Sequence, residues 1–372
     1  MKVPFLNLKV AFKERQKLLK LTNKILTSGK ILNGNEPFKL EKKLCQLTKS
    51  KYAVSVSSGS SALYLALSAS GIGYDDEVIT TAFSWVITSN AITSLGAKPV
   101  FVDIDENFNI DPKKIEQAIT KNTKAIVPVH IAGKLCEMEK IAKIAKKYNL
   151  KIIEDAAQAF GSSFSKRKPG FFSEACAFSF NPMKVLHAYG EAGAVVTNRK
   201  KIFEKLKQLR HAGTIRKNKD NINNCVSSSL NHKIDTLQAS FVLQNIYRLK
   251  SIIKKRNQIF KLYSANLKEY LKHQNIKKFE THSCYLFLGR FNQRDKLKSF
   301  LSKRKIETRI FYSPLINNAP YYKSRYKNFN LKNSELFLKS VLALPMHENL
   351  TIKQIYYVIS SIKIFYESKN LS

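Results

Sequence analysis

Residues 175–198 have the sequence ACAFSFNPMKVLHAYGEAGAVVTN, in which two short apolar runs flank one lysine, Lys184. Such runs, bounded by glycine and polar residues, are typical of buried strands. Lysine is abundant in this chain, and a lysine is usually a solvated surface charge. Lys184 instead stands in apolar, glycine-punctuated sequence, so we interpret it as a candidate amine nucleophile.

Further apolar runs precede this stretch and alternate with helical patterns, such as the one at residues 137–148. The predicted strands are residues 52–56, 77–80, 98–104, 124–131, 151–156, 175–180 and 193–198. Alternation of strands with helices indicates an α/β fold in which a mostly parallel sheet, buried on both faces, lies between helices.

The pattern changes after residue 199, where a helix at 201–211 leads into a polar, basic loop at 214–229. A long helical stretch is expected at residues 234–272. The remaining expected elements are strands at 285–291 and 306–312, with a helix at 295–304 between them, and a closing helix at 352–367. We therefore predict a large domain over residues 1–235, with an N-terminal arm, and a long helix plus a smaller α+β domain over 236–372.

Composition narrows the possible classes of protein. The formal net charge of +37 suggests nucleic-acid binding, but the lysines are spread along all 372 residues without a basic tail or a recognisable nucleic-acid module. The five cysteines form no CxxC pair, which implies neither a disulfide framework nor a zinc site. No apolar run is long enough for a membrane span or a signal peptide, so a cytoplasmic protein is expected, with no nucleic-acid or membrane partner.

A first candidate ligand-binding element is SSGSSALYLAL at residues 57–67, where a strand gives way to a helix. Gly59, Ser60 and Ser61 would present backbone amides and hydroxyls at the helix N-terminus, where the dipole favours a phosphate. Serine also caps many helices that bind no ligand. A phosphate site and a simple helix cap both remain open here.

A second element is KIIEDAAQAFG at residues 151–161, an apolar run that ends in a pair of carboxylates. Ligands of open α/β sheets lie beyond the carboxyl ends of strands, so Asp155 is suited to pair with a pyridinium nitrogen and Gln158 to reach a ring hydroxyl. A helix N-cap is the alternative role for Asp155. Trp85, the only tryptophan, is suited to stack on a planar cofactor, although a lone aromatic is more often part of the core. Together with Lys184, these residues favour a Schiff base to pyridoxal phosphate.

The order of these elements resembles the DegT/DnrJ/EryC1/StrS family of sugar aminotransferases, pyridoxal-phosphate enzymes of fold type I, the aspartate aminotransferase fold. The resemblance runs through VPFLNLK, SSGSSALYLAL, TTAFSWVITSNAI, KPVFVDIDENFNIDPKKIEQAI, AIVPVHIAG, IIEDAAQAFGS, FSFNPMK, GEAGAVVTN, SLNHKIDTLQAS and LALPMHENLTIKQIYYVISSI. It implies that Lys184 forms the Schiff base and moves a proton, that Asp155 binds the ring nitrogen, and that Gln158 binds the ring oxygen. Trp85 matches the stacking aromatic, and the residues matching phosphate ligands are Ser60, Ser61, Ser179 and, from the neighbouring subunit, Asn231. A homodimer with shared active sites is therefore implied.

The resemblance also implies the substrates: L-glutamate as amino donor and a nucleotide-linked keto-deoxyhexose as acceptor, for surface polysaccharide (lipopolysaccharide) or glycan biosynthesis. A diphosphate needs cations, and the loop residues Arg216, Lys217 and Lys219 are one source, although an exposed loop is commonly charged. His282 and Tyr312 lie in segments that resemble regions near the family's sugar pocket, with structural roles as the alternative.

Two departures from the family pattern concern the neighbourhood of Asn231. Ser229 and Lys233 stand where glycine and arginine are commoner, and LRHAGT, which contains His211, replaces LRNHGQ.

Two other functions stay open: a cofactor-binding sensor or assembly subunit without turnover, and a sugar dehydratase. The retained Lys184 argues against the dehydratase, in which a histidine replaces the lysine.

Overall fold

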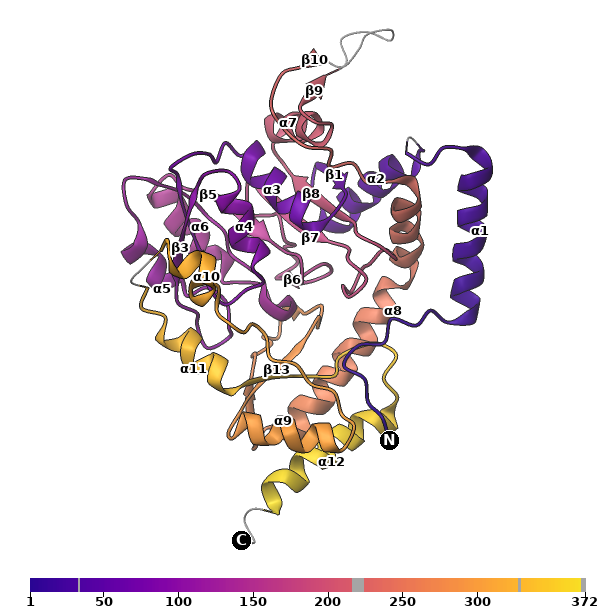
Figure 1. The fold of residues 1–372 in the computed structure, drawn as a ribbon, viewed down its shortest axis with the longest axis vertical. Helices are drawn as coiled ribbons and strands as arrows, with labels where there is room; N and C mark the ends of the chain where they lie inside the picture. The colour runs from indigo at the N-terminus through magenta and orange to yellow at the C-terminus, as the bar shows by residue number, and fades with distance from the viewer. Residues whose placement is uncertain (33, 216–223, 327–328, 369–372) are drawn as a thin grey trace.

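The larger part of the molecule is built on a seven-stranded sheet (Figure 1). The computed structural model describes residues 1–32, 34–215, 224–326 and 329–368. In spatial order the strands are β1 (Tyr52–Val56), β8 (Gly193–Thr197), β7 (Ala175–Ser179), β5 (Lys151–Asp155), β4 (Thr123–Ile126), β2 (Glu77–Thr81) and β3 (Lys98–Val102). β8 runs antiparallel to both of its neighbours, and the other neighbouring strands are parallel. The predicted α/β fold with a mostly parallel sheet is confirmed.

Both faces of this sheet are buried because successive strand residues pack into different cores. Ala177 and Val195 belong to a cluster with helices α3, α4 and α7, whereas Phe178 and Ala194 belong to a cluster with α2 and α8. The helices of this part are α2 (Glu36–Thr48), α3 (Gly59–Ala69), α4 (Ile87–Thr93), α5 (Pro112–Ile115), α6 (Met138–Lys147) and α7 (Lys200–Arg210). Near-continuous apolar strands are what a sheet covered on both sides requires.

The second half of the chain is organised around a long helix, α8 (Thr236–Leu267), which runs from beside α2 down to α9 and α12 (Figure 1). A three-stranded antiparallel sheet, in the order β11, β13, β14, packs there with a core of its own. The elements of this region are β11 (Leu271–His273), β13 (Phe287–Phe291), α9 (Arg294–Lys303), α10 (Pro320–Lys323), α11 (Lys332–Ser340), β14 (Val341–Leu344) and α12 (Ile352–Glu367). The domain division at residues 235 and 236 stays a prediction.

The N-terminal segment joins the two parts. Val3 pairs with Ile306 in the smaller part, and α1 (Phe12–Ser28) then runs beside α8 at the outer edge of the molecule (Figure 1). Four short strands complete the described elements: β6 (Ser163–Phe164), β9 (Thr214–Ile215), β10 (Asn224–Cys225) and β12 (Glu280–Thr281). None of the helices within the described ranges is both long and apolar enough to span a bilayer.

Two element predictions were wrong. Residues 306–312 do not form a strand: Ile306 and Arg309 make isolated bridges, and the chain turns from Phe311 toward Pro314. The small sheet takes β14 instead, whose residues are all buried. The helix expected at 234–272 ends at Leu267, because β11 begins at Leu271 and pairs with β13. In both cases the pairing partner, a long-range feature, decided the local structure.

Candidate functional site

A cavity of about 440 Å³ lies at the carboxyl edge of the large sheet. The chain segments that follow β1, β2, β5 and β7 all leave the sheet at this edge, because these strands run in one direction. Seven of the residues predicted from the sequence line the cavity: Ser60, Trp85, Asp155, Gln158, Ser179, Lys184 and Tyr312. Residues separated by up to 252 positions in the sequence therefore meet at one place, as the strand-end rule predicts.

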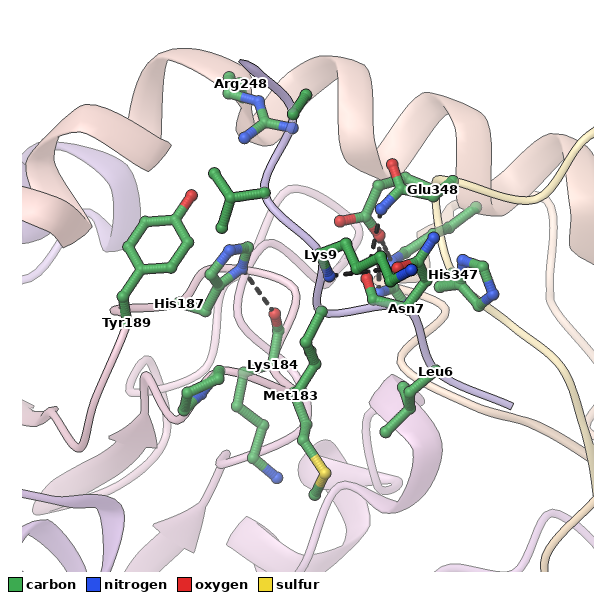
Figure 2. A pocket seen from close by; sticks show the side chains of 16 residues that line it. Leu6, Asn7, Lys9, Met183, Lys184, His187, Tyr189, Arg248, His347 and Glu348 are labelled. Carbon is green, nitrogen blue, oxygen red and sulfur yellow. Dashed lines mark hydrogen bonds and ion pairs between the residues drawn. The ribbon is translucent and has the colours of Figure 1, made fainter. Parts of the chain in front are cut away.

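Lys184 lies in a tight turn just beyond β7. Its backbone N–H donates to the Asn181 carbonyl at 2.8 Å, and its own carbonyl accepts from His187 Nδ1 at 3.2 Å (Figure 2). The ammonium lies 4.4 Å from the centre of the Tyr285 ring. Among the described residues, no carboxylate forms an ion pair with it. The amine is thus held by its backbone and left free to react with a ligand in the cavity.

The turn that holds Lys184 separates two cavities. Met183 and Lys184 also border a second cavity, of about 360 Å³, which lies toward the N-terminal segment at Leu6 and Asn7. Figure 2 shows this second cavity, in which the Lys184 side chain points away from His187. The reactive amine is therefore oriented toward the cavity that contains the other predicted residues.

Asp155 ends β5 and is buried, with 7% of its surface exposed. Its Oδ2 accepts a hydrogen bond from the Thr88 hydroxyl at 2.8 Å, and its Oδ1 accepts from the Ala157 N–H at 3.2 Å. No helix follows, so Asp155 is not the helix N-cap that was its alternative role. The carboxylate borders the cavity and has lone pairs that no donor of the described residues uses. It can therefore accept a hydrogen bond from a protonated ring nitrogen bound there.

Gln158 and Tyr312 form a buried pair on the same wall. The Gln158 amide nitrogen donates to the Tyr312 hydroxyl at 2.7 Å, and its oxygen accepts from the Ala132 N–H at 2.8 Å. Burial raises the pKa of Tyr312 well above its usual value, so the phenol stays protonated. The amide keeps one further N–H for a ligand oxygen.

The predicted phosphate contacts separate into two groups. Ser60 and Ser179 line the cavity beside the N-terminus of α3, and Gly59 permits this because a Cβ there would lie 2.5 Å from Ser179 Cβ. Ser61 does not line it: its hydroxyl instead contacts Ser57, Ser58 and His232 Nδ1 at 3.0 to 3.1 Å. The α3 cap is Ser58, whose side chain accepts from the Ser61 N–H. Ser61 therefore supports the turn from within the protein.

Trp85 is not part of the core. Its side chain lies at the cavity with 62% of its surface exposed, which is unusual for the largest apolar residue. A ring in this position can stack on a planar group bound in the cavity.

His282 is placed elsewhere. It is fully buried, packs against the Phe260 ring at 5.5 Å between centroids, and is not part of the cavity wall. Burial, together with the Lys134 charge, lowers the pKa of His282 to about 3. Its Nδ1 accepts from the Cys284 N–H at 2.8 Å, as a neutral ring requires. The prediction of a direct sugar contact is not supported by this position, because burial in the core sets its role.

The remaining predicted residues are Asn231 and three cations of the neighbouring loop. Asn231 is exposed, bridges to His211 through its backbone, and lies outside the cavity of its own chain. Its contribution from a neighbouring subunit stays a prediction. Arg216, Lys217 and Lys219 lie outside the described residues.

Ser84, Thr88 and Arg309 are among the cavity-wall residues that the sequence analysis missed. Ser84 and Thr88 are spaced four apart after β2, and an i, i+4 polar pair at a strand end is a signal that could have indicated them. Arg309 lies in the segment expected as a strand, and no local pattern distinguishes it from other surface arginines. Within the described ranges, no group of three or more His, Cys, Asp and Glu side chains is arranged to hold a metal ion.

Comparisons with known proteins agree with this geometry. Residues 13–363 match the model of the DegT/DnrJ/EryC1/StrS aminotransferase family. The chain is 34% identical to a pleiotropic regulatory protein of Geobacillus stearothermophilus, covering 98% of this chain and 99% of that protein. It is 33% identical to dTDP-3-amino-3,6-dideoxy-alpha-D-galactopyranose transaminase of Aneurinibacillus thermoaerophilus, covering 97% and 98%.

Solved structures show the same fold. DesV of S. venezuelae, solved with a ketimine intermediate, superimposes with a TM-score of 0.93 at 32% identity, covering 98% of this chain and 99% of that one. NtdA of Bacillus subtilis, solved with bound PMP, gives 0.91 at 30% identity, covering 97% and 84%. Fold and site thus define a pyridoxal-phosphate-dependent aminotransferase of fold type I. The chain belongs to the DegT/DnrJ/EryC1/StrS aminotransferase family.

Proposed function

We propose that this enzyme transfers the amino group of L-glutamate to the keto group of a nucleotide-linked keto-deoxyhexose, for surface polysaccharide or glycan biosynthesis. The observation behind this proposal is that Lys184, whose amine pairs with no carboxylate of the described residues, and the buried strand-end carboxylate Asp155 share one cavity. The names of relatives such as the dTDP-sugar transaminase support a nucleotide-sugar acceptor.

Each residue on the cavity wall has a role in the proposed reaction that follows from its position. When bound, pyridoxal phosphate would supply an electron-withdrawing ring and an aldehyde group that can carry the amino group between donor and acceptor. Lys184 Nζ holds the cofactor and moves protons as general base and acid, and Asp155 keeps the ring nitrogen protonated. Ser60, Ser179 and the α3 N-terminus bind the phosphate, and Trp85 covers one ring face.

Arg309 is suited to bind a carboxylate of the amino donor. Arg309 borders the cavity, its guanidinium stacks 5.1 Å from the Phe5 ring centre, and no carboxylate of the described residues pairs with it. Its backbone is fixed by two hydrogen bonds with Ala343, at 3.3 and 2.8 Å. Replacing Arg309 with Met should raise the KM for glutamate about tenfold, since a charge-assisted contact is lost.

The central test is chemical trapping on Lys184. Purified protein should show the absorbance band of a lysine-bound pyridoxal group, and borohydride should fix that group on the peptide containing Lys184. The Lys184→Ala variant should lack the band, whereas Lys168→Ala, a lysine distant from the cavity wall, should keep it. A band unchanged in Lys184→Ala would contradict the proposal.

Turnover distinguishes the enzyme from a sensor. The 34% identical relative named as a pleiotropic regulatory protein keeps open a cofactor-binding sensor or assembly subunit without turnover. Release of 2-oxoglutarate from glutamate, with keto-sugar nucleotides present as acceptors, is the expected result for a transaminase. Trapping on Lys184 without any 2-oxoglutarate would favour the sensor.

We further propose a homodimer whose active sites are shared through Asn231. Leu230, next to Asn231, is 71% exposed and Tyr247 is 83% exposed, and large exposed apolar side chains mark interfaces. Mixing Lys184→Ala with Asn231→Ala protein tests sharing directly, because a mixed dimer contains one site with both native residues. Random mixing should restore about a quarter of wild-type activity. No recovery after subunit exchange would contradict shared sites.

A further inference from the structure

Two hydroxyls form a chain that ends on the Asp155 carboxylate. The Ser84 and Thr88 oxygens are 2.8 Å apart, and Thr88 Oγ1 is 2.8 Å from Asp155 Oδ2. All three side chains are buried, with exposures of 3%, 1% and 7%. The chain therefore lies out of contact with bulk water, where hydrogen bonds to a charged group are strong.

The direction of the protons in this chain follows from the donors available. A hydroxyl has one proton, and an ionised carboxylate can only accept, so Thr88 donates to Asp155. Thr88 must then accept from Ser84, whose proton points toward Thr88. Both dipoles are aligned toward the carboxylate and stabilise its negative charge.

The same turn fixes two sides of the cavity. Ser84, in the turn before α4, and Thr88, in the first turn of α4, are buried on the cavity wall, whereas Trp85, one residue after Ser84, lies at the same cavity with 62% of its surface exposed. The helix is held from the C-terminal part of the chain, because Tyr322 donates its hydroxyl proton to Asn90 Oδ1 at 2.6 Å. A shift of this turn would move the ring-stacking residue and the carboxylate together.

We infer that Thr88, supported by Ser84, is a positioning residue that fixes the Asp155 carboxylate for the ring nitrogen of the cofactor and ties it to the Trp85 turn. This inference rests on the proposed function. Without the Thr88 hydroxyl, the 3.2 Å contact to the Ala157 N–H is the one hydrogen bond left to the Asp155 carboxylate within the described part of the chain, so the carboxylate can rotate away from the cavity.

The test measures cofactor affinity of the apoprotein through the fluorescence of Trp85, which is the only tryptophan and borders the cavity. Thr88→Val removes the hydroxyl at constant shape and should weaken pyridoxal phosphate binding about tenfold, the value of one hydrogen bond to a charged group. Thr88→Ser restores the hydroxyl and should bind within about threefold of wild type. The matched control is Thr80→Val in β2, since the buried Thr80 hydroxyl donates to the Val127 carbonyl at 2.9 Å, away from the cavity.

The outcomes distinguish failure of the Thr88 positioning role from failure of the proposed function. Thr80→Val should lower the thermal midpoint and leave cofactor affinity unchanged. If Thr88→Val binds as tightly as wild type, or if Thr88→Ser fails to recover affinity, the positioning role is overturned while the proposed function stands. A wild-type chain whose fluorescence does not respond to pyridoxal phosphate would overturn both.

Discussion

The two carboxylates that end β5 are neighbours in sequence and lie in opposite environments. Glu154 is 1% exposed, and its oxygens accept hydrogen bonds from His130 Nε2, the Gly170 N–H and the Ser173 hydroxyl at 2.6 to 2.9 Å. The Asp155 carboxylate, on the other face of the strand, accepts from Thr88 and Ala157 among the described residues and borders the cavity at the sheet edge.

The difference is one of remaining hydrogen-bonding capacity. Glu154 borders a separate cavity of about 360 Å³, but its carboxylate already accepts three hydrogen bonds from the protein. These bonds connect β5 to the 170–173 turn and to His130. His130 is itself held, since its Nδ1 accepts from the Cys136 N–H at 3.1 Å. A buried carboxylate that already accepts three hydrogen bonds from the protein is structural, and one that accepts fewer and borders a cavity is available for chemistry.

The largest expected effect is on turnover. Asp155→Asn should lower kcat for the glutamate half-reaction by about a thousandfold, because a neutral amide cannot hold the ring nitrogen protonated. Single-turnover absorbance measures this step. Glu154→Gln, the matched neighbour, should keep activity within about tenfold. Equal losses in both variants would contradict the distinction drawn between the two faces.

The second effect is on stability, where the larger loss is expected at Glu154 and the smaller loss at Asp155. Glu154→Ala should lower the free energy of unfolding by about 3 kcal/mol, because it leaves buried donors at His130, Gly170 and Ser173 without an acceptor. Urea unfolding of the two apoproteins provides the measurement. If Asp155→Ala destabilises the fold more than Glu154→Ala, the assignment of the structural role to Glu154 is wrong.

A buried histidine in the smaller part extends the comparison to pH. Burial lowers the pKa of His282 from 6.5 to about 3. Between these two pH values His282 is protonated in the unfolded chain and neutral in the folded chain. Its contribution to stability is complete above pH 6.5 and is lost as the pH falls toward 3. Unfolding measured from pH 7 to 4 should have a smaller pH slope in His282→Gln, with a difference on the order of 2 kcal/mol at pH 4. Parallel curves would contradict this assignment.

The smallest effect concerns Asp103, a carboxylate that, like Glu154, accepts several hydrogen bonds and that joins the two parts of the molecule. It accepts from the Asn333 and Ser334 N–H groups at 2.7 and 2.8 Å and so caps α11 from 230 residues away. Asp103→Ala should cost about 1 kcal/mol of unfolding free energy. Differential scanning calorimetry would detect this, and an unchanged transition temperature would argue against the cap.

The sequence indicated which polar residues lie at the carboxyl edge of the large sheet, because the signals for them are local. The apolar runs, the glycines and the strand-end polar residues placed Lys184, Asp155, Gln158 and Trp85 on one cavity without any knowledge of long-range contacts. The expectations at 306–312 and 234–272 failed where another segment decided the outcome: pairing of β13 with β14 and β11.

The sequence by itself determined the α/β order of elements and the residue types at the strand ends, because hydrophobic periodicity and turn chemistry act over a few residues. Only the tertiary structure decided which of two adjacent carboxylates faces the cavity, that Thr88 and Ser84 hold Asp155, that Arg309 borders the site, and that His282 is buried away from it. Each of these depends on which distant segment packs against a given face, and successive residues of one strand point to opposite faces.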